Sequence, residues 1–163
     1  MELLSACEPQ VLALADALRA RGWRLASAES CTGGLIAAAC TSVAGSSDWF
    51  ERGFVTNSNE AKMQMLGVDA GLIARHGAVS EEVARAMLSG TLATSPVQLA
   101  VAVTGIAGPG GAVPGKPVGT VWLAWGTVAS AHALRLQLDG DRTAVRVATV
   151  QAALHRLIAA AGS

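Results

Sequence analysis

The chain is poor in aromatic and charged residues. It has no Tyr, and only 4% of its 163 residues are aromatic and 15% charged. Because 52% are hydrophobic, the composition excludes charge-rich disorder. Twelve basic and twelve acidic residues cancel, and no basic run is present, so we expect no nucleic-acid partner. Zero net charge weakens repulsion between copies, so we expect a homo-oligomer.

Long apolar runs and paired cysteines are also missing. Ala86 to Gly115 carries no charge, but polar residues and a Gly-Pro-Gly-Gly run interrupt it, so we expect no membrane span. Glu2 and the lack of a basic segment argue against a signal peptide. Three cysteines without CxxC spacing fit a reduced, cytoplasmic protein. Three scattered histidines and no clustered acids predict no metal site.

Apolar segments alternate with turn residues in a pattern typical of an α/β protein. Apolar residues recur at helical spacing after Pro9, and Gln98–Val103 is typical of a buried strand. We therefore expect residues 1–163 to form a single-domain α/β sandwich with a mixed sheet flanked by helices. Helices are predicted over 9–21, 35–41, 59–66, 69–76, 81–92 and 142–160, strands over 23–28, 53–56, 98–103, 118–125 and 130–138, and loops over 45–52 and 104–117.

A glycine-rich turn joins the first predicted strand to the next helix. Ser30 stands at the strand end, beside helix N–H groups that could stabilise an oxyanion. Gly33 and Gly34 would let a substrate approach the backbone. By spacing alone, Ser30 or Thr32 could equally be a helix cap. We expect Cys31 to be a buried structural residue, because no histidine is placed to activate it.

Lys62 is an isolated lysine on the helix predicted to begin at Asn59. A lysine beside a serine can act as a general base when burial lowers its pKa. A solvated lysine on a helix face explains the same pattern. His76, His132 and His155 form no Ser-His-Asp pattern with a nearby serine.

Two further segments are candidate binding elements. The long loop that begins at Thr104 follows a buried strand, where α/β sheets place ligand loops, although a structural crossover explains it as well. Arg142 stands in the first turn of the last helix, where the helix dipole disfavours a cation. This placement predicts an anionic partner, either a carboxylate or a phosphate.

In this order, several segments closely resemble the CinA C-terminal domain family: AESCTGG, SVAGSSDWFERGFVTNSNEAK, LGV, HGAVSEEVA, AVTGIAGPGG, KPVGTVWLA and GDRTAVR. The resemblance extends from about Ala26 to the end of the last helix. It implies a stand-alone nicotinamide-nucleotide amidase, a Ser-Lys amidohydrolase that takes no cofactor. Such an enzyme converts nicotinamide mononucleotide to nicotinic acid mononucleotide and ammonia, and so serves pyridine nucleotide recycling.

The resemblance also implies roles for single residues. Ser30 matches the nucleophile and Lys62 the general base, with the backbone N–H groups from Thr32 to Gly34 as the oxyanion hole. The substrate-binding residues that it implies are Ser47, Asn57, Thr104, Gly105 and Arg142.

One position departs from the family pattern: Asn57 stands where the family usually has tyrosine. A shorter, more polar side chain predicts a wetter site in which Lys62 stays protonated more readily. Two alternatives therefore stay open. One is a non-catalytic module that binds a nucleotide or a protein in competence or DNA damage, and the other is a related amidase with a different substrate.

Overall fold

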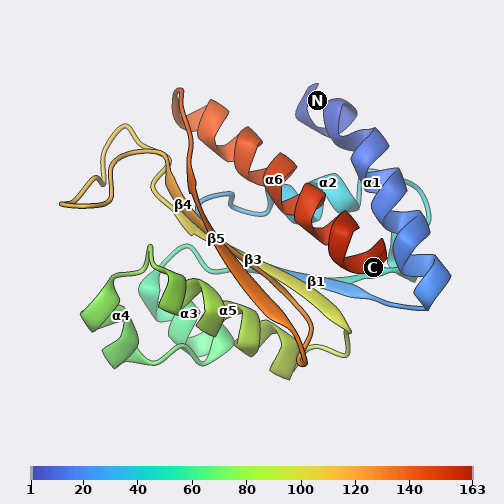
Figure 1. Ribbon diagram of the computed structural model, residues 1–163, viewed down its shortest axis with the longest axis horizontal. Helices are drawn as coiled ribbons and strands as arrows, with labels where there is room; N and C mark the ends of the chain where they lie inside the picture. The colour runs from blue at the N-terminus through green and yellow to red at the C-terminus, as the bar shows by residue number, and fades with distance from the viewer. Residues whose placement is uncertain (1, 163) are drawn as a thin grey trace.

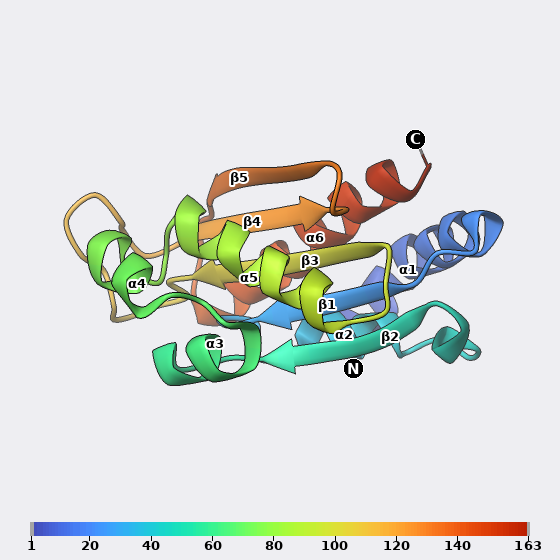
Figure 2. The same ribbon diagram turned by 90° about the horizontal axis from the view of Figure 1, so that it is seen from below.

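The computed structural model describes residues 2–162, and a twisted mixed sheet forms its centre (Figure 2). Within those residues the strand order is β2-β1-β3-β4-β5. β1 (Leu25–Glu29) lies parallel to β2 (Phe50–Val55) and to β3 (Leu99–Gly105). β4 (Thr120–Gly126) and β5 (Ala131–Gln137) continue the sheet in antiparallel pairing. The carboxyl ends of β1, β2 and β3 therefore share one edge.

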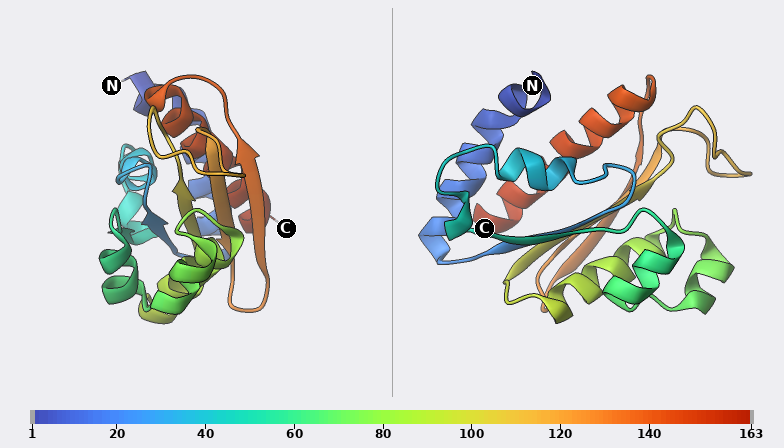
Figure 3. Two further views of the ribbon diagram at one scale, coloured as in Figure 1. Left: turned by 90° about the vertical axis from the view of Figure 1, so that its left-hand side faces the viewer. Right: turned by 180° about the vertical axis from the view of Figure 1, so that it is seen from behind.

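Helices cover both faces of the sheet, and this confirms the predicted α/β sandwich (Figures 1 and 3). Along β3, Leu99, Val101 and Val103 face one layer, whereas Ala100 and Ala102 face the other. Because the second set is small, α5 can pack closely on the sheet. The first layer holds α1 (Glu2–Arg21), α2 (Leu35–Cys40) and α6 (Arg142–Gly162), and the second holds α3 (Asn59–Leu66), α4 (Ala70–His76) and α5 (Glu81–Thr94).

Local capping fixes several helix ends where the sequence predicted them. Ser58 Oγ accepts a hydrogen bond from the Ala61 N–H at 3.0 Å, and Gly67 ends α3 with φ +67°. Ser80 Oγ accepts from the Val83 N–H at 3.3 Å and caps α5. The bounds of α3 coincide with the prediction, so the position of Lys62 on this helix follows from local sequence.

Two predicted element starts were wrong by three residues or more, while the other predicted ends differ from the structure by at most two residues. The first helix begins at Glu2 rather than Pro9, because buried Cys7 extends the apolar stripe across the proline. The segment 45–52, predicted as a loop, contains the 3-10 turn η1 (Ser46–Asp48) and the first residues of β2. There, pairing of Phe50 with Leu25 of β1 overrides a loop-like composition.

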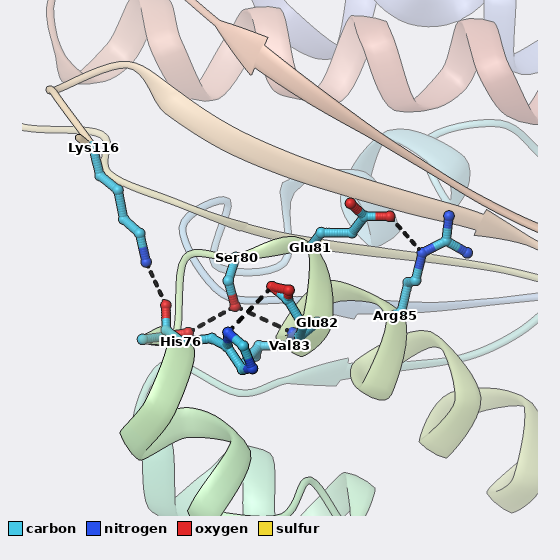
Figure 4. Close-up of polar contacts among 8 residues, drawn as sticks. His76, Ser80, Glu81, Glu82, Val83, Arg85 and Lys116 are labelled. Atoms are coloured by element: carbon cyan, nitrogen blue, oxygen red, sulfur yellow. Dashed lines mark hydrogen bonds and ion pairs between the residues drawn. The ribbon is translucent and has the colours of Figure 1, made fainter.

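The long loop after β3 is attached to the corner between α4 and α5 (Figure 4). The Lys116 ammonium donates a hydrogen bond to the His76 carbonyl, and Arg135 donates to the Gly115 carbonyl at 3.0 Å. Beside them, His76 Nδ1 lies 3.6 Å from the Glu82 carboxylate. The loop projects from the body of the molecule (Figure 3). The Lys116 contact ties its outer part to the second helical layer, and the Arg135 contact ties it to β5.

Candidate active site

Ser30 and Lys62 meet at the carboxyl edge of the parallel strands. Ser30 directly follows β1, and Lys62 lies on α3, which follows β2 (Figure 2). Lys62 Nζ is 3.0 Å from Ser30 Oγ and donates a second hydrogen bond to the Thr56 carbonyl at 2.8 Å. The structure therefore places an amine within proton-transfer reach of a hydroxyl.

The Lys62 amine lies in an environment that favours its neutral form. The residue is only 1% exposed. Burial lowers the pKa of the Lys62 amine, while the Cys31 thiol acts weakly in the opposite direction. The solvated-lysine interpretation is therefore wrong, since Lys62 points into the protein.

The turn after Ser30 presents a limited set of backbone donors. The Gly33 N–H donates to the Ser30 carbonyl at 3.1 Å, so this predicted oxyanion donor is already engaged. Within residues 2–162, neither the Thr32 N–H nor the Gly34 N–H donates to a protein acceptor. Gly33 and Gly34 have φ values of +58° and +102°, which favour glycine. Of these three predicted donors, the Gly33 N–H is engaged and Thr32 is fully buried, so only the Gly34 N–H is both without a protein acceptor and on a partly exposed residue of the described range.

Glu29, which was not among the predicted site residues, anchors this turn. Its carboxylate is buried and accepts hydrogen bonds from Thr32 Oγ1 at 2.5 Å, the Ile36 N–H at 2.9 Å and the Ala37 N–H at 3.0 Å. The Thr32 side chain is therefore engaged, and the whole residue is buried, with 0% of its surface exposed. An acidic residue just before a helix start was the available signal, because helix N–H groups attract a carboxylate.

Two arginines of α6 hold the backbone of two different segments. Arg142 donates to the Gly108 carbonyl at 2.9 Å, and Arg146, one turn later, donates to the carbonyls of Cys31 and Thr32 at 3.1 and 3.3 Å. Arg142 also lines a cavity of about 510 Å³ with Pro109 and Val118. The partner of Arg142 in the structure is thus a backbone carbonyl, where the sequence predicted a carboxylate or a phosphate. Arg146 was not predicted, although it lies four residues from Arg142 on the same helix face.

Thr104 and Gly105 support the site from the neighbouring strand. The Val103 carbonyl accepts a hydrogen bond from the Ser30 N–H, which ties the ends of β1 and β3 together. Thr104 is buried, and its hydroxyl donates to the Ala78 carbonyl at 2.9 Å. A Cβ on Gly105 would lie 2.6 Å from Val121 and 3.2 Å from Cys31 Sγ, so glycine permits this close packing.

Ser47 does not join the other predicted site residues. It is exposed in η1, which precedes β2 at the opposite edge of the sheet from Ser30. The five-residue β1 separates the two edges by about 16 Å at the usual rise per residue. Asn57, in contrast, directly follows Thr56 beside Lys62, with an exposed side chain.

The Cys31 side chain is half-buried next to Ser30, and burial raises the pKa of its thiol to about 11. This agrees with a structural rather than a reactive thiol. In residues 2–162, no group of three His, Cys, Asp or Glu side chains could hold a metal ion. No helix of that range is long and apolar enough to cross a membrane.

The fold and site define an α/β protein with a serine–lysine pair at the carboxyl edge of its parallel strands. The sequence model of the CinA C-terminal domain family matches residues 8–161. The chain therefore belongs to the CinA C-terminal domain family.

Its relatives include proteins of similar length and longer ones. Nicotinamide-nucleotide amidohydrolase PncC of Pseudomonas putida is 54% identical over 89% of this chain and 91% of its own length. The PncC protein of Escherichia coli K12 is 51% identical over 87% of both chains. A CinA-like protein of Citrifermentans bemidjiense is 57% identical over 88% of this chain, which spans only 35% of that relative.

A solved structure agrees with this assignment. The competence damage-inducible protein A of Klebsiella pneumoniae superimposes with a TM-score of 0.91 at 43% sequence identity. The match covers 93% of this chain and 94% of the other. The sheet order and helical layers described above are therefore those of this family.

Proposed function

We propose that this protein is an amidohydrolase that deamidates nicotinamide mononucleotide to nicotinic acid mononucleotide and ammonia. The observation that carries the proposal is the 3.0 Å approach of the buried Lys62 amine to the Ser30 hydroxyl. The names of the PncC relatives, at 51% to 54% identity, supply the substrate.

The chemistry follows from the two side chains. Neutral Lys62 takes the Ser30 proton as Oγ attacks the carboxamide carbon, and a tetrahedral oxyanion forms. When this intermediate collapses, the C–N bond breaks and the proton passes from Lys62 to the departing ammonia. Lys62 then activates a water molecule, which cleaves the Ser30 ester to release the carboxylic acid. One water is consumed for each ammonia released. The nicotinic acid mononucleotide that forms would return to pyridine nucleotide recycling.

Ammonia release from nicotinamide mononucleotide tests this proposal. We expect turnover by the wild type, loss of turnover in a folded Ser30→Ala variant, and retained turnover in Cys31→Ala. Loss only in Cys31→Ala would move the nucleophile to the thiol. Ammonia from another carboxamide alone would favour a related amidase, and binding of the mononucleotide without turnover would favour a non-catalytic module.

The substrate phosphate has a candidate partner in Arg142. One of its N–H groups is engaged by the Gly108 carbonyl, and the guanidinium has others to offer in the cavity that it lines. We expect Arg142→Ala to raise KM for the mononucleotide more than KM for free nicotinamide. Loss of a charged hydrogen bond should weaken binding of the mononucleotide by about 1.5–3 kcal/mol, which changes the ratio of the two KM values by about 10- to 150-fold. Equal changes in the two KM values would mean that Arg142 only holds the loop through the Gly108 carbonyl.

A further inference from the structure

We propose that the cavity between the long loop after β3, the corner between α4 and α5, and the sheet binds a nucleotide, with its aromatic base on Trp122 and its phosphate among three cations of the wall. These cations are Arg75, Lys116 and Arg135. The site is separate from the proposed catalytic pair, and its binding does not depend on amidase activity. Among residues 2–162, none lines both this cavity and the cavity beside Arg142.

The cavity has a volume of about 360 Å³ and one aromatic wall. Trp122 of β4 lies directly opposite Arg135 of β5, so these two side chains are neighbours on the same face of the sheet. Trp122 is half-buried and packs against the apolar cluster that includes Val83 and Met87 of α5, which holds its ring in place. The volume lies in the range of about 300–1,000 Å³ that is typical of small-molecule sites.

The three cations of the wall have no carboxylate partner. Within residues 2–162, none of Arg75, Lys116 and Arg135 forms an ion pair. Arg135 donates to the Gly115 carbonyl at 3.0 Å, and Lys116 reaches from the loop to the His76 carbonyl (Figure 4). A lysine has three donors and an arginine five, so most of their N–H groups stay available to a ligand. Because these contacts already order the side chains, less entropy is lost when an anion binds.

Two carboxylates also line the cavity, and each faces another side chain. Glu81 accepts a hydrogen bond from Arg85 Nε at 2.9 Å, and Glu82 lies 3.6 Å from His76 Nδ1 (Figure 4). Arg85 is not part of the wall, so it offsets the charge of Glu81 from outside the cavity. The wall therefore keeps an excess of positive charge, which favours a phosphate, while the Trp122 ring favours a base that can stack on it.

Calorimetric binding of adenosine monophosphate to the purified chain tests this site, since the probe carries one base and one phosphate. We expect Lys116→Ala and Arg135→Ala each to weaken binding about 10-fold, the lower end for a charged hydrogen bond because the cavity is open to water. Glu82→Gln removes a carboxylate from the wall and should strengthen binding, which damage to the fold would not do. Arg156→Ala is the matched control: it removes a cation of α6 that lies 5.5 Å from the Trp125 ring, and it should bind like the wild type.

The contribution of Trp122 is measured with a second ligand. The wild type should bind adenosine monophosphate at least about 5-fold more tightly than ribose 5-phosphate, which lacks the base, because stacking stabilises the complex. Trp122→Leu should remove this preference and leave the affinity for ribose 5-phosphate unchanged. Equal affinities of the two ligands for the wild type would overturn stacking on Trp122.

The binding data also decide between this cavity and the others. A wild type that does not bind adenosine monophosphate, or unchanged binding in both Lys116→Ala and Arg135→Ala, would overturn the site, as would a Glu82→Gln variant that binds no more tightly. Loss of binding only in Arg142→Ala would place the nucleotide in the other cavity. Ser30→Ala should bind the probe like the wild type, so failure of ammonia release alone would overturn the proposed function and not this site.

Discussion

At the scale of single residues, burial determines what Lys62 can do. Its amine has a carbonyl and a hydroxyl as neighbours but almost no water, so the charged form loses hydration. Loss of hydration lowers the pKa of Lys62 from the usual value of about 10.4, which increases the fraction of neutral amine near neutral pH.

This burial predicts the pH dependence of turnover. A neutral Lys62 is the active form, so kcat should rise with pH through a midpoint below the usual lysine pKa, and this can be measured by ammonia release across pH. Lys62→Ala should lower kcat by at least about 10²-fold and remove the midpoint. Lys62→Arg should be equally inactive, because a guanidinium keeps its proton. If kcat still rises with pH in either variant, a group other than Lys62 causes the pH dependence.

The Lys62 amine is less exposed to water than the presence of asparagine at position 57 predicted. Lys62 is already 1% exposed with asparagine at position 57, and the Asn57 side chain is exposed. The expectation of a wetter lysine is therefore wrong for this structure. We expect Asn57→Tyr to leave the midpoint of the pH profile in place and to change KM for the mononucleotide by a few-fold. A shifted midpoint would show that residue 57 does control hydration of the amine.

At the scale of elements, the site depends on how closely α3 and α5 pack. α3 carries Lys62, and its last residue, Leu66, lies against Gly90 of α5. A Cβ on Gly90 would lie 2.0 Å from the Leu66 carbonyl oxygen, so the two helices can approach this closely only where no side chain intervenes.

Gly90→Ala should therefore separate the two helices. We expect it to destabilise the protein by about 1–3 kcal/mol, as overpacked sites do, and to lower kcat through movement of Lys62. Chemical denaturation and ammonia release measure the two effects. Gly162→Ala is the control, since a Cβ at Gly162 meets no atom within 4 Å. Equal stability of the two variants would contradict the packing argument.

At the scale of the whole molecule, one edge of the sheet is open to a partner. β2 is an edge strand in the described sheet, and Val55 at its end is 48% exposed. Met63 and Met65 on the adjacent α3 are exposed as well. With zero net charge, little repulsion opposes contact between two such edges.

We expect light scattering after gel filtration to give a mass that is a multiple of 16.5 kDa. Val55→Lys should shift this mass toward the monomer, because a charged side chain on an edge strand disfavours pairing. Val128→Lys, at an 87% exposed position between β4 and β5, should leave the mass unchanged. A wild-type monomer at all concentrations would contradict the expectation of a homo-oligomer.

The sequence by itself determined the helix and strand order and the family. Caps such as Ser58 and Ser80 and the apolar strand after Pro96 act over a few residues, so local patterns define them. The motif around Ser30 placed the candidate nucleophile at a strand end, and the resemblance paired it with Lys62.

The tertiary structure decided which side chains meet. Ser30 and Lys62 are 32 residues apart, and Arg146 is more than 110 residues from the turn that it holds, so no local pattern records either contact. Strand direction placed Ser47 at the far edge of the sheet, and helix packing buried the Lys62 amine. Local sequence sets backbone conformation over a few residues, whereas burial and long-range hydrogen bonds depend on how the sheet and its two helical layers come together.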